Sequence, residues 1–274
     1  MKTTSVLNIA HRGARSLAPE NTLAAAQKAL ETGAEMWELD VAMSADGVLF
    51  LNHDDTLVRT SNVKAVFPER RPWRVADFTL AEIRQLDFGS WFNRQDPFGQ
   101  IAAGQVSAAD LARYAGEPAP TLAEALAFTR QHHWRVNVEI KDLSGAAGDV
   151  DVVEKAVALI EELQMDDRVL LSSFNHRYLQ RVKAANPRLN TAALVSRPGL
   201  KPAALLKRLG AKGYHPSYVA AVWPGAIANL RARGFEVNVW TVNDERKMRR
   251  LIKAGVSGII TDFPQRLRQL LQGR

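Results

Sequence analysis

The chain has 274 residues and no cysteine, and its 36 lysines and arginines exceed its 29 acids to give a net charge of +7. The absence of cysteine excludes a disulfide scaffold, thiolate zinc sites and cysteine nucleophiles. No segment approaches the ~20 apolar residues that span a bilayer. The first apolar run is also too short for a signal peptide, so we expect a cytoplasmic protein without stable membrane insertion.

The basic excess is concentrated in one stretch, because no acid lies between Asp167 and Glu236. Such a field suits an anionic partner, whether a small phosphate, a nucleic acid or a phospholipid surface. Solvated helix faces would give the same pattern. The stretch holds no recognition-helix motif, no RNA-binding aromatic pair and no long basic amphipathic helix, so we expect no nucleic-acid partner.

Short β-branched or aliphatic runs alternate along the chain with amphipathic helical stretches. The predicted strands are 6–10, 36–42, 48–52, 136–140, 169–172, 191–195, 211–214, 236–241 and 258–261. The predicted helices are 22–32, 122–131, 150–163, 176–185, 202–209, 225–233, 245–254 and 264–271. Helix N-caps are expected at Asn21 and Asp244, and a capping box at Thr121 with Glu124.

This alternation predicts an α/β fold with a parallel sheet covered by helices. About eight repeats with nearly continuous apolar strands favour a closed (β/α)8 TIM barrel. An open doubly wound sheet is the alternative, but no glycine-rich nucleotide loop follows a strand.

Residues 56–118 interrupt the rhythm, because they are rich in proline and glycine and only 80–86 reads as helical. We therefore expect one domain, 1–274, with an insertion of irregular structure at approximately 56–118. An insertion after a barrel strand lies over the face where chemistry occurs, although it could be a packing lid without catalytic residues.

Polar residues recur at the ends of the early strands. Glu38 and Asp40 lie two apart in one predicted strand, and Glu139 and Lys141 lie two apart in another, so each pair shares a face. Carboxylates among apolar strands cost several kcal/mol unless they are paired or bind a metal. Exposed faces or a simple Glu139–Lys141 pair would explain them separately. Together they suit a hard cation such as Mg²⁺, Ca²⁺ or Mn²⁺.

The string His11-Arg12-Gly13, followed after a spacer by Pro19-Glu20-Asn21-Thr22, resembles the signature of the glycerophosphodiester phosphodiesterase family. The resemblance continues through the rest of the chain in order. Its further segments are Glu38-Leu39-Asp40, Asp46-Gly47, Asn52-His53-Asp54, Glu139-Ile140-Lys141, Ser172-Ser173-Phe174, Val239-Trp240-Thr241-Val242-Asn243 and Gly258-Ile259-Ile260-Thr261-Asp262-Phe263-Pro264. The family's fold is a (β/α)8 barrel with an insertion after its second strand–turn unit.

The resemblance implies metal-dependent hydrolysis of glycerophosphodiesters to sn-glycerol 3-phosphate and an alcohol. It also implies a role for each motif residue. The metal ligands would be Glu38, Asp40 and Glu139, the general acid and base His11 and His53, and the phosphate contacts Arg12 and Lys141. Water and the substrate's glycerol 2-hydroxyl both remain open as the nucleophile.

Two aromatic residues, Trp240 and Phe174, are candidates for the glycerol side of the pocket, with core packing as the alternative. Glu20 would support the site indirectly, by holding residues that contact the substrate or the metal. The alternative activity is that of a lysophospholipase D-like phosphodiesterase on longer-chain glycerophospholipids. The expected partner is a small glycerophosphodiester substrate, and the sequence does not predict an oligomeric state.

Overall fold

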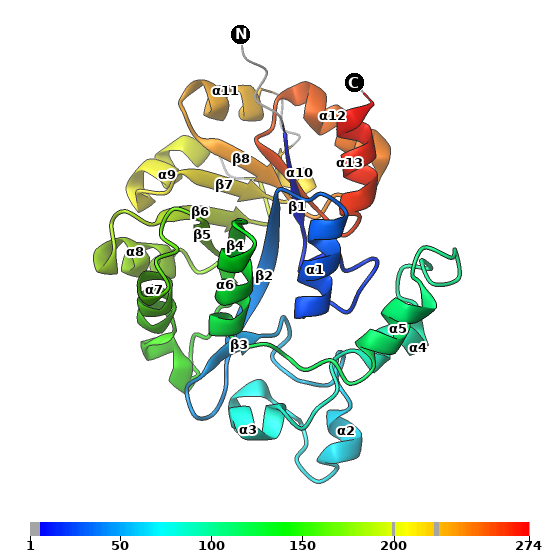
Figure 1. Cartoon of the computed structure of the whole chain (residues 1–274). Helices are drawn as coiled ribbons and strands as arrows, with labels where there is room; N and C mark the ends of the chain where they lie inside the picture. The colour runs from blue at the N-terminus through cyan, green and yellow to red at the C-terminus, as the bar shows by residue number, and fades with distance from the viewer. Residues whose placement is uncertain (1–5, 199–200, 222–224, 274) are drawn as a thin grey trace.

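The computed structural model describes residues 6–198, 201–221 and 225–273 as a barrel of strands surrounded by helices (Figure 1). The strands are β1 (Leu7–Ala10), β2 (Met36–Met43), β3 (Leu49–Leu51), β4 (Val136–Ile140), β5 (Val169–Ser173), β6 (Asn190–Val195), β7 (Gly213–Pro216), β8 (Glu236–Val239) and β9 (Gly258–Thr261). The main covering helices are α1 (Leu23–Glu31), α6 (Leu122–Gln131), α7 (Val152–Glu162), α8 (His176–Ala185), α9 (Pro202–Leu209), α11 (Ala226–Ala232), α12 (Glu245–Ala254) and α13 (Pro264–Gln272). Short helices η2 (Ala147–Val150) and α10 (Tyr218–Ala221) lie in the connections.

Eight of the strands close into a parallel barrel, which confirms the predicted fold class. Their order is β1, β2, β4, β5, β6, β7, β8 and β9, and β9 pairs in parallel with β1 to complete the ring. Closure brings the carboxyl ends of all eight strands to one rim, where side chains far apart in sequence can meet.

The strand β3 is not a barrel strand, because it pairs antiparallel with the carboxyl-terminal end of β2, at Val41–Met43. The predicted strand 48–52 is therefore the second arm of a hairpin that extends past the rim. Its return path brings the chain back to the level of Asp40, whose carbonyl accepts a hydrogen bond from the Asn52 amide at 3.1 Å. The hairpin thus carries His53 to the rim, as a barrel strand would have done.

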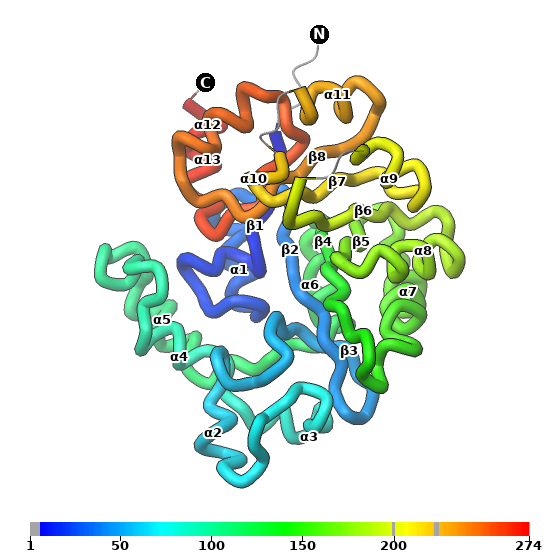
Figure 2. Tube along the Cα trace, turned by 180° about the vertical axis from the view of Figure 1, so that it is seen from behind, coloured from blue at the N-terminus to red at the C-terminus, as the bar shows by residue number. Residues whose placement is uncertain are grey.

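The segment between β3 and α6 is less irregular than predicted. It contains α2 (Val63–Val66), η1 (Val75–Asp77), α3 (Leu80–Ile83), α4 (Ser90–Gln95) and α5 (Ala108–Tyr114). Helices of four to seven residues show too few turns for an apolar period to stand out in the sequence. Figure 2 shows this segment wrapping the side of the barrel next to β3 and α1. Part of it packs in an apolar cluster in which Leu57, Trp73 and Phe78 join Ala42 of β2 and Phe50 of β3.

Local capping signals have a mixed outcome. The Thr121 capping box and the Asp244 N-cap are confirmed, each with its side chain accepting from a first-turn amide. The N-cap predicted at Asn21 is wrong, since Thr22 caps α1 through a bond from the Ala25 amide. Asn21 adopts a left-handed backbone, with φ of 56°, and directs its side chain to the barrel rim instead.

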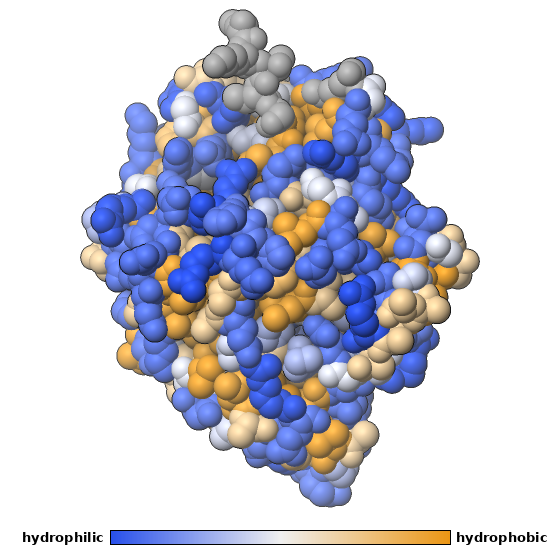
Figure 3. All heavy atoms as spheres, viewed as in Figure 1, coloured by the Kyte–Doolittle hydropathy of each residue, from blue (hydrophilic) through white to orange (hydrophobic). Residues whose placement is uncertain are grey.

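The stretch without acids covers β5, β6 and β7 with the helices that follow them. Its lysines and arginines lie mainly at the outer surface, and Figure 3 shows a largely polar face with scattered apolar residues. Among the described residues, no helix combines the length and the apolar character needed to cross a membrane.

Candidate active site

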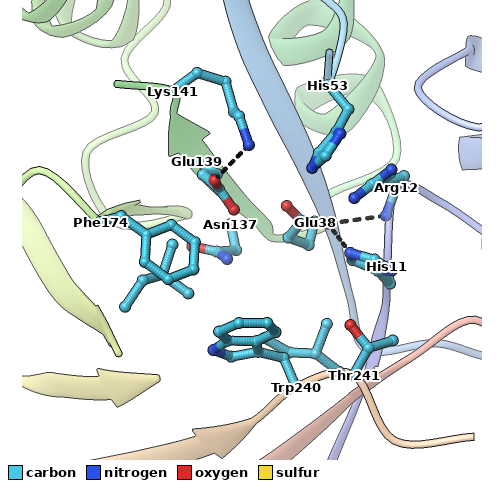
Figure 4. Close-up of a pocket in the computed structure, with 12 residues that line it drawn as sticks. His11, Arg12, Glu38, His53, Asn137, Glu139, Lys141, Phe174, Trp240 and Thr241 are labelled. Carbon is cyan, nitrogen blue, oxygen red and sulfur yellow. Dashed lines mark hydrogen bonds and ion pairs between the residues drawn. The ribbon is translucent and has the colours of Figure 1, made fainter. Parts of the chain in front are cut away.

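A small cavity of about 90 Å³ opens at the carboxyl rim of the barrel (Figure 4). We call it the inner cavity. It is lined by His11, Arg12, Glu38, His53, Asn137, Glu139, Lys141, Phe174, Leu194, Trp240, Thr241 and Ile260. All the candidate site residues except Asp40 belong to this lining, although they come from segments spread over most of the chain.

Strand register brings the three candidate metal ligands together. In the parallel pair β2–β4, Asp40 lies opposite Glu139, and Glu38 lies on the same inward face of β2. One carboxylate oxygen from each residue lies within 4.8 Å of the other two, and all three residues are buried. A cluster of three buried carboxylate oxygens is a donor set that could hold a divalent cation.

Burial and the close approach of the three carboxylates shift their pKa values. Burial, followed by repulsion from the other carboxylates, raises the pKa of Glu38 well above its usual range and also raises that of Glu139. Burial acts on Asp40 in the same direction, but Arg12, His53 and Lys141 outweigh it and lower the pKa of Asp40. A bound cation would relieve the repulsion, so the chemistry of the cluster fits a metal site.

The loop after β1 is tied to the same strand. The Arg12 amide donates to Glu38 Oε2 at 2.9 Å. Asn21 donates from Nδ2 to Asp40 Oδ2 at 2.9 Å and accepts from the Asp40 amide at 3.1 Å. These bonds explain why Asn21 is not the helix cap, because both polar atoms of its side chain orient Asp40.

Each of the two candidate histidines pairs with an aspartate. His11 Nδ1 lies 2.7 Å from Asp262 Oδ1, and His53 Nδ1 lies 2.6 Å from Asp54 Oδ1. This leaves Nε2 of both rings for the cavity, and Nε2 of His11 lies 4.0 Å from Glu38 Oε2. Burial and then Arg12 lower the pKa of His11, against the opposing effect of Asp262.

The two candidate phosphate contacts reach the cavity from opposite sides of the carboxylates. Arg12 Nη1 lies 2.7 Å from Glu20 Oε1, and its Nε lies 3.1 Å from Asp40 Oδ2. Lys141 Nζ lies 3.1 Å from Glu139 Oε1 and 3.7 Å from Asp40 Oδ1. Each of these two charged side chains is thus held at the edge of the carboxylate cluster and still lines the inner cavity.

Trp240 and Phe174 form one wall of the inner cavity (Figure 4). Their rings meet edge to face with centroids 5.4 Å apart, and the Trp240 Nε1 donates to the His215 carbonyl at 2.7 Å. Phe174 is 42% exposed, so it stands at the mouth and not in the core.

A second cavity of about 780 Å³, the outer cavity, adjoins the first and shares His53 and Lys141 with it. It lies between the β2–β3 hairpin, the segment after His53 and the connection that follows β4. Its lining mixes apolar residues such as Met43, Val75 and Leu143 with polar ones. The two cavities differ almost ninefold in size, so the site has a narrow side and a wide side.

Several residues of the site had no assigned role in the sequence. Asp54 and Asp262 stand inside quoted motifs, but their partners are fixed only by the fold. Asn137 lies two residues before Glu139 on the same inward face and lines the inner cavity, with its Oδ1 buried and unpaired among the described residues. The spacing to Glu139 was the available signal. Nothing in the sequence indicated Arg59, which binds Glu20 and Asp54.

The inner cavity brings two histidines, which can transfer protons, beside cationic side chains and a carboxylate cluster that could hold a metal ion. This combination suits the hydrolysis of a phosphoric ester. Fold and site together therefore define a barrel phosphohydrolase. The model of the Glycerophosphoryl diester phosphodiesterase family matches residues 11–266, and the chain belongs to that family. It is thus a phosphoric diester hydrolase, as the resemblance of its motifs implied.

Similar proteins agree over nearly the full length. A glycerophosphodiester phosphodiesterase of Caldanaerobacter subterraneus subsp. tengcongensis is 37% identical over 272 residues, covering 99% of each chain. A phosphodiesterase structure from Oleispira antarctica, in complex with the product sn-glycerol 3-phosphate, has a TM-score of 0.76 and 30% identity over 97% of this chain and 96% of its own. A glycerophosphodiester phosphodiesterase structure from Agrobacterium tumefaciens has a TM-score of 0.73 and 28% identity, covering 95% and 98%.

Proposed function

We propose that this chain hydrolyses glycerophosphodiesters to sn-glycerol 3-phosphate and an alcohol, acting as one catalytic unit over residues 1–274. The observation that carries the proposal is the meeting of the carboxylate cluster with two histidine–aspartate pairs at one cavity. The Oleispira antarctica relative supports the product, because its structure holds sn-glycerol 3-phosphate.

Glu38, Asp40 and Glu139 would hold one divalent cation, which is Mg²⁺, Ca²⁺ or Mn²⁺ because the donors are all hard oxygens. When bound, such a cation polarises a phosphoryl oxygen and offsets the charge that builds up in the transition state. The raised pKa values of Glu38 and Glu139 mean that cation binding at neutral pH also favours their ionised forms.

Arg12 and Lys141 hold the phosphate from two sides. Arginine offers a planar fork to two oxygens, whereas lysine acts as a point charge. The Arg12 fork has a fixed direction, because Nη1 donates to Glu20 Oε1 and the guanidinium forms an ion pair with Asp40. Both side chains therefore stabilise the negative charge of the trigonal-bipyramidal transition state without having to reorganise.

His11 and His53 divide the two proton transfers. Expulsion of an alkoxide requires a donor, and activation of the attacking oxygen requires an acceptor. The wide outer cavity begins at His53 and offers room for an alcohol of variable size. We therefore assign the protonation of the leaving alcohol to His53 Nε2. His11, on the narrow side, takes the proton of the nucleophile, which is water or the glycerol 2-hydroxyl.

Trp240 and Phe174 bound the narrow side, where the glycerol carbons pack against an aromatic face. The small inner cavity of about 90 Å³ suits unacylated glycerol better than the glycerol of a lysophospholipid. The lysophospholipase D-like alternative requires the acyl chain of the substrate to extend out of the inner cavity past Phe174 at its mouth. The site therefore favours deacylated diesters over longer-chain glycerophospholipids.

The test is a side-by-side assay of glycerophosphocholine, glycerophosphoethanolamine and a lysophospholipid, with release of glycerol 3-phosphate as the readout. We expect turnover of the first two and at most a small fraction of that rate with the lysophospholipid. Faster cleavage of the lysophospholipid would favour the alternative activity, and no turnover of any of the three would refute the proposal.

A further inference from the structure

Arg59 lies in the segment that follows β3, outside the set of residues that line the two cavities. Its side chain is 39% exposed. The guanidinium group lies between two carboxylates, Glu20 from the loop after β1 and Asp54 from the end of the hairpin. Glu20 also contacts Arg12, and Asp54 also contacts His53, so each carboxylate touches a residue that lines the inner cavity.

Both contacts use two nitrogen–oxygen pairs. Toward Glu20, Arg59 donates from Nη1 to Oε2 at 2.9 Å and from Nη2 to Oε1 at 2.8 Å. Toward Asp54, it donates from Nε to Oδ2 at 2.6 Å and from Nη2 to Oδ1 at 3.2 Å. A fork bound on both edges fixes the distance and the relative orientation of the two carboxylates, which a lysine could not do.

Glu20 connects Arg59 to Arg12, the proposed phosphate contact. Glu20 is 4% exposed, and its Oε1 also accepts from Arg12 Nη1 at 2.7 Å. Burial raises the pKa of Glu20, but Arg59, Arg12 and Arg15 outweigh it and hold that pKa below the usual range. Glu20 is therefore ionised, and the position of its carboxylate sets the position of the Arg12 fork.

Asp54 connects Arg59 to His53, the proposed general acid. The oxygen of Asp54 that receives the longer bond from Arg59, Oδ1, lies 2.6 Å from His53 Nδ1. Asp54 is 30% exposed, so packing alone does not fix its side chain. Arg59 holds this carboxylate in place. The carboxylate in turn accepts from Nδ1 of His53 and directs Nε2, which carries the proton to be transferred, toward the cavity.

We propose that Arg59 is a positioning residue for the hydrolysis, coupling the loop after β1 to the hairpin and thereby aligning Arg12 and His53 at once. The inference rests on the proposed function of the site. It also gives the segment after β3, where a lid without a role in catalysis was one expectation, a direct part in organising the reaction.

The test compares Arg59→Ala with Arg84→Ala. Arg84 is the matched control, because it also lies in the segment after β3 and forms an ion pair with a barrel helix, through Glu124, away from both cavities. We expect Arg59→Ala to lower kcat/KM with glycerophosphocholine by about 10- to 100-fold, the usual effect of removing an orienting partner. We expect Arg84→Ala to remain within about twofold of the wild type.

Two further readouts separate positioning from general support of the fold. Because the Arg59 site is open to solvent, millimolar guanidinium chloride should restore much of the activity of Arg59→Ala, whereas an equal concentration of sodium chloride should not. Inhibition by the product glycerol 3-phosphate should also weaken in Arg59→Ala, since Arg12 is less well held. Arg59→Lys should recover only part of the activity, since lysine keeps the charge but cannot bind both carboxylates in pairs.

The effect should also depend on Asp54. In an Asp54→Asn background, Arg59→Ala should lower kcat by a smaller factor than in the wild type, because one of its two routes is already lost. A kcat/KM for Arg59→Ala equal to that of Arg84→Ala, or a loss that guanidinium does not relieve, would overturn the inference. An inactive wild type would instead refute the proposed function and is seen in the same experiment.

Discussion

The assignment of His53 as the proton donor to the leaving alcohol can be tested by changing the alcohol. In the His53→Ala variant, the choline or ethanolamine alkoxide must depart without a proton. A p-nitrophenolate is stable near neutral pH and needs no donor. The loss of activity should therefore be large for glycerophosphocholine and small for the p-nitrophenyl ester of glycerol phosphate.

The size of the difference follows from the role that the structure gives to His53. A positioned general acid contributes about 10²- to 10⁴-fold, which corresponds to about 2.7 to 5.4 kcal/mol of transition-state stabilisation. The Nδ1 bond of 2.6 Å to Asp54 orients the ring, so we expect a value in this range. With the p-nitrophenyl ester, the same substitution should cost less than about tenfold.

The assay is the steady-state measurement of kcat/KM for both substrates with the wild type, His53→Ala and His11→Ala. His11 faces the narrow side of the site and serves as the control. Its substitution should slow both substrates by similar factors, because activation of the nucleophile is needed for each. Equal losses for both substrates in His53→Ala, or a selective rescue in His11→Ala, would refute the assignment.

Three other outcomes follow from the geometry. Asp262→Asn should lower kcat about 10- to 100-fold without a matching change in melting temperature, because the single amide oxygen cannot accept from both His11 Nδ1 and Asn243 Nδ2; an unchanged kcat would contradict this. Trp240→Ala should raise KM more than it lowers kcat, which initial rates over a range of glycerophosphocholine concentrations would show. Burial lowers the pKa of His215 to about 3, so the unfolded chain takes up this proton first as the pH falls below ~6.5, and stability declines from there toward pH 3. Urea unfolding should assign about 2 kcal/mol of the loss between pH 7.5 and pH 5 to this group, and His215→Asn should remove that part of the pH dependence.

The fold was predictable because its signal is repeated along the chain. Each barrel unit carries an apolar strand and an amphipathic helix, as in the pair formed by β5 and α8. The position of β3 was not predictable in the same way. An apolar run of three residues has the same composition in a hairpin arm as in a barrel strand, and only pairing with β2 distinguishes them.

The candidate site was predictable where alternation fixes which side chains share a face. Glu38 and Asp40 on β2 share one face because residues two apart do so, and Lys141, directly after β4, follows Glu139 at the same spacing. The supporting residues could not be found by such rules. Arg59 reaches Glu20 over 39 residues and Asn21 reaches Asp40 over 19, and each contact depends on the route of a loop. Asn21 was assigned to the helix by a local rule, but a tertiary contact took both of its polar atoms.

The most direct test of the central claim is the turnover of glycerophosphocholine by protein treated with EDTA, before and after a divalent cation is returned, in the wild type and in Asp40→Asn. The account predicts that the treated wild type is inactive, that Mg²⁺, Ca²⁺ or Mn²⁺ restores its turnover, and that Asp40→Asn stays at least about 100-fold below the restored rate. Full turnover by the wild type in cation-free buffer would contradict it.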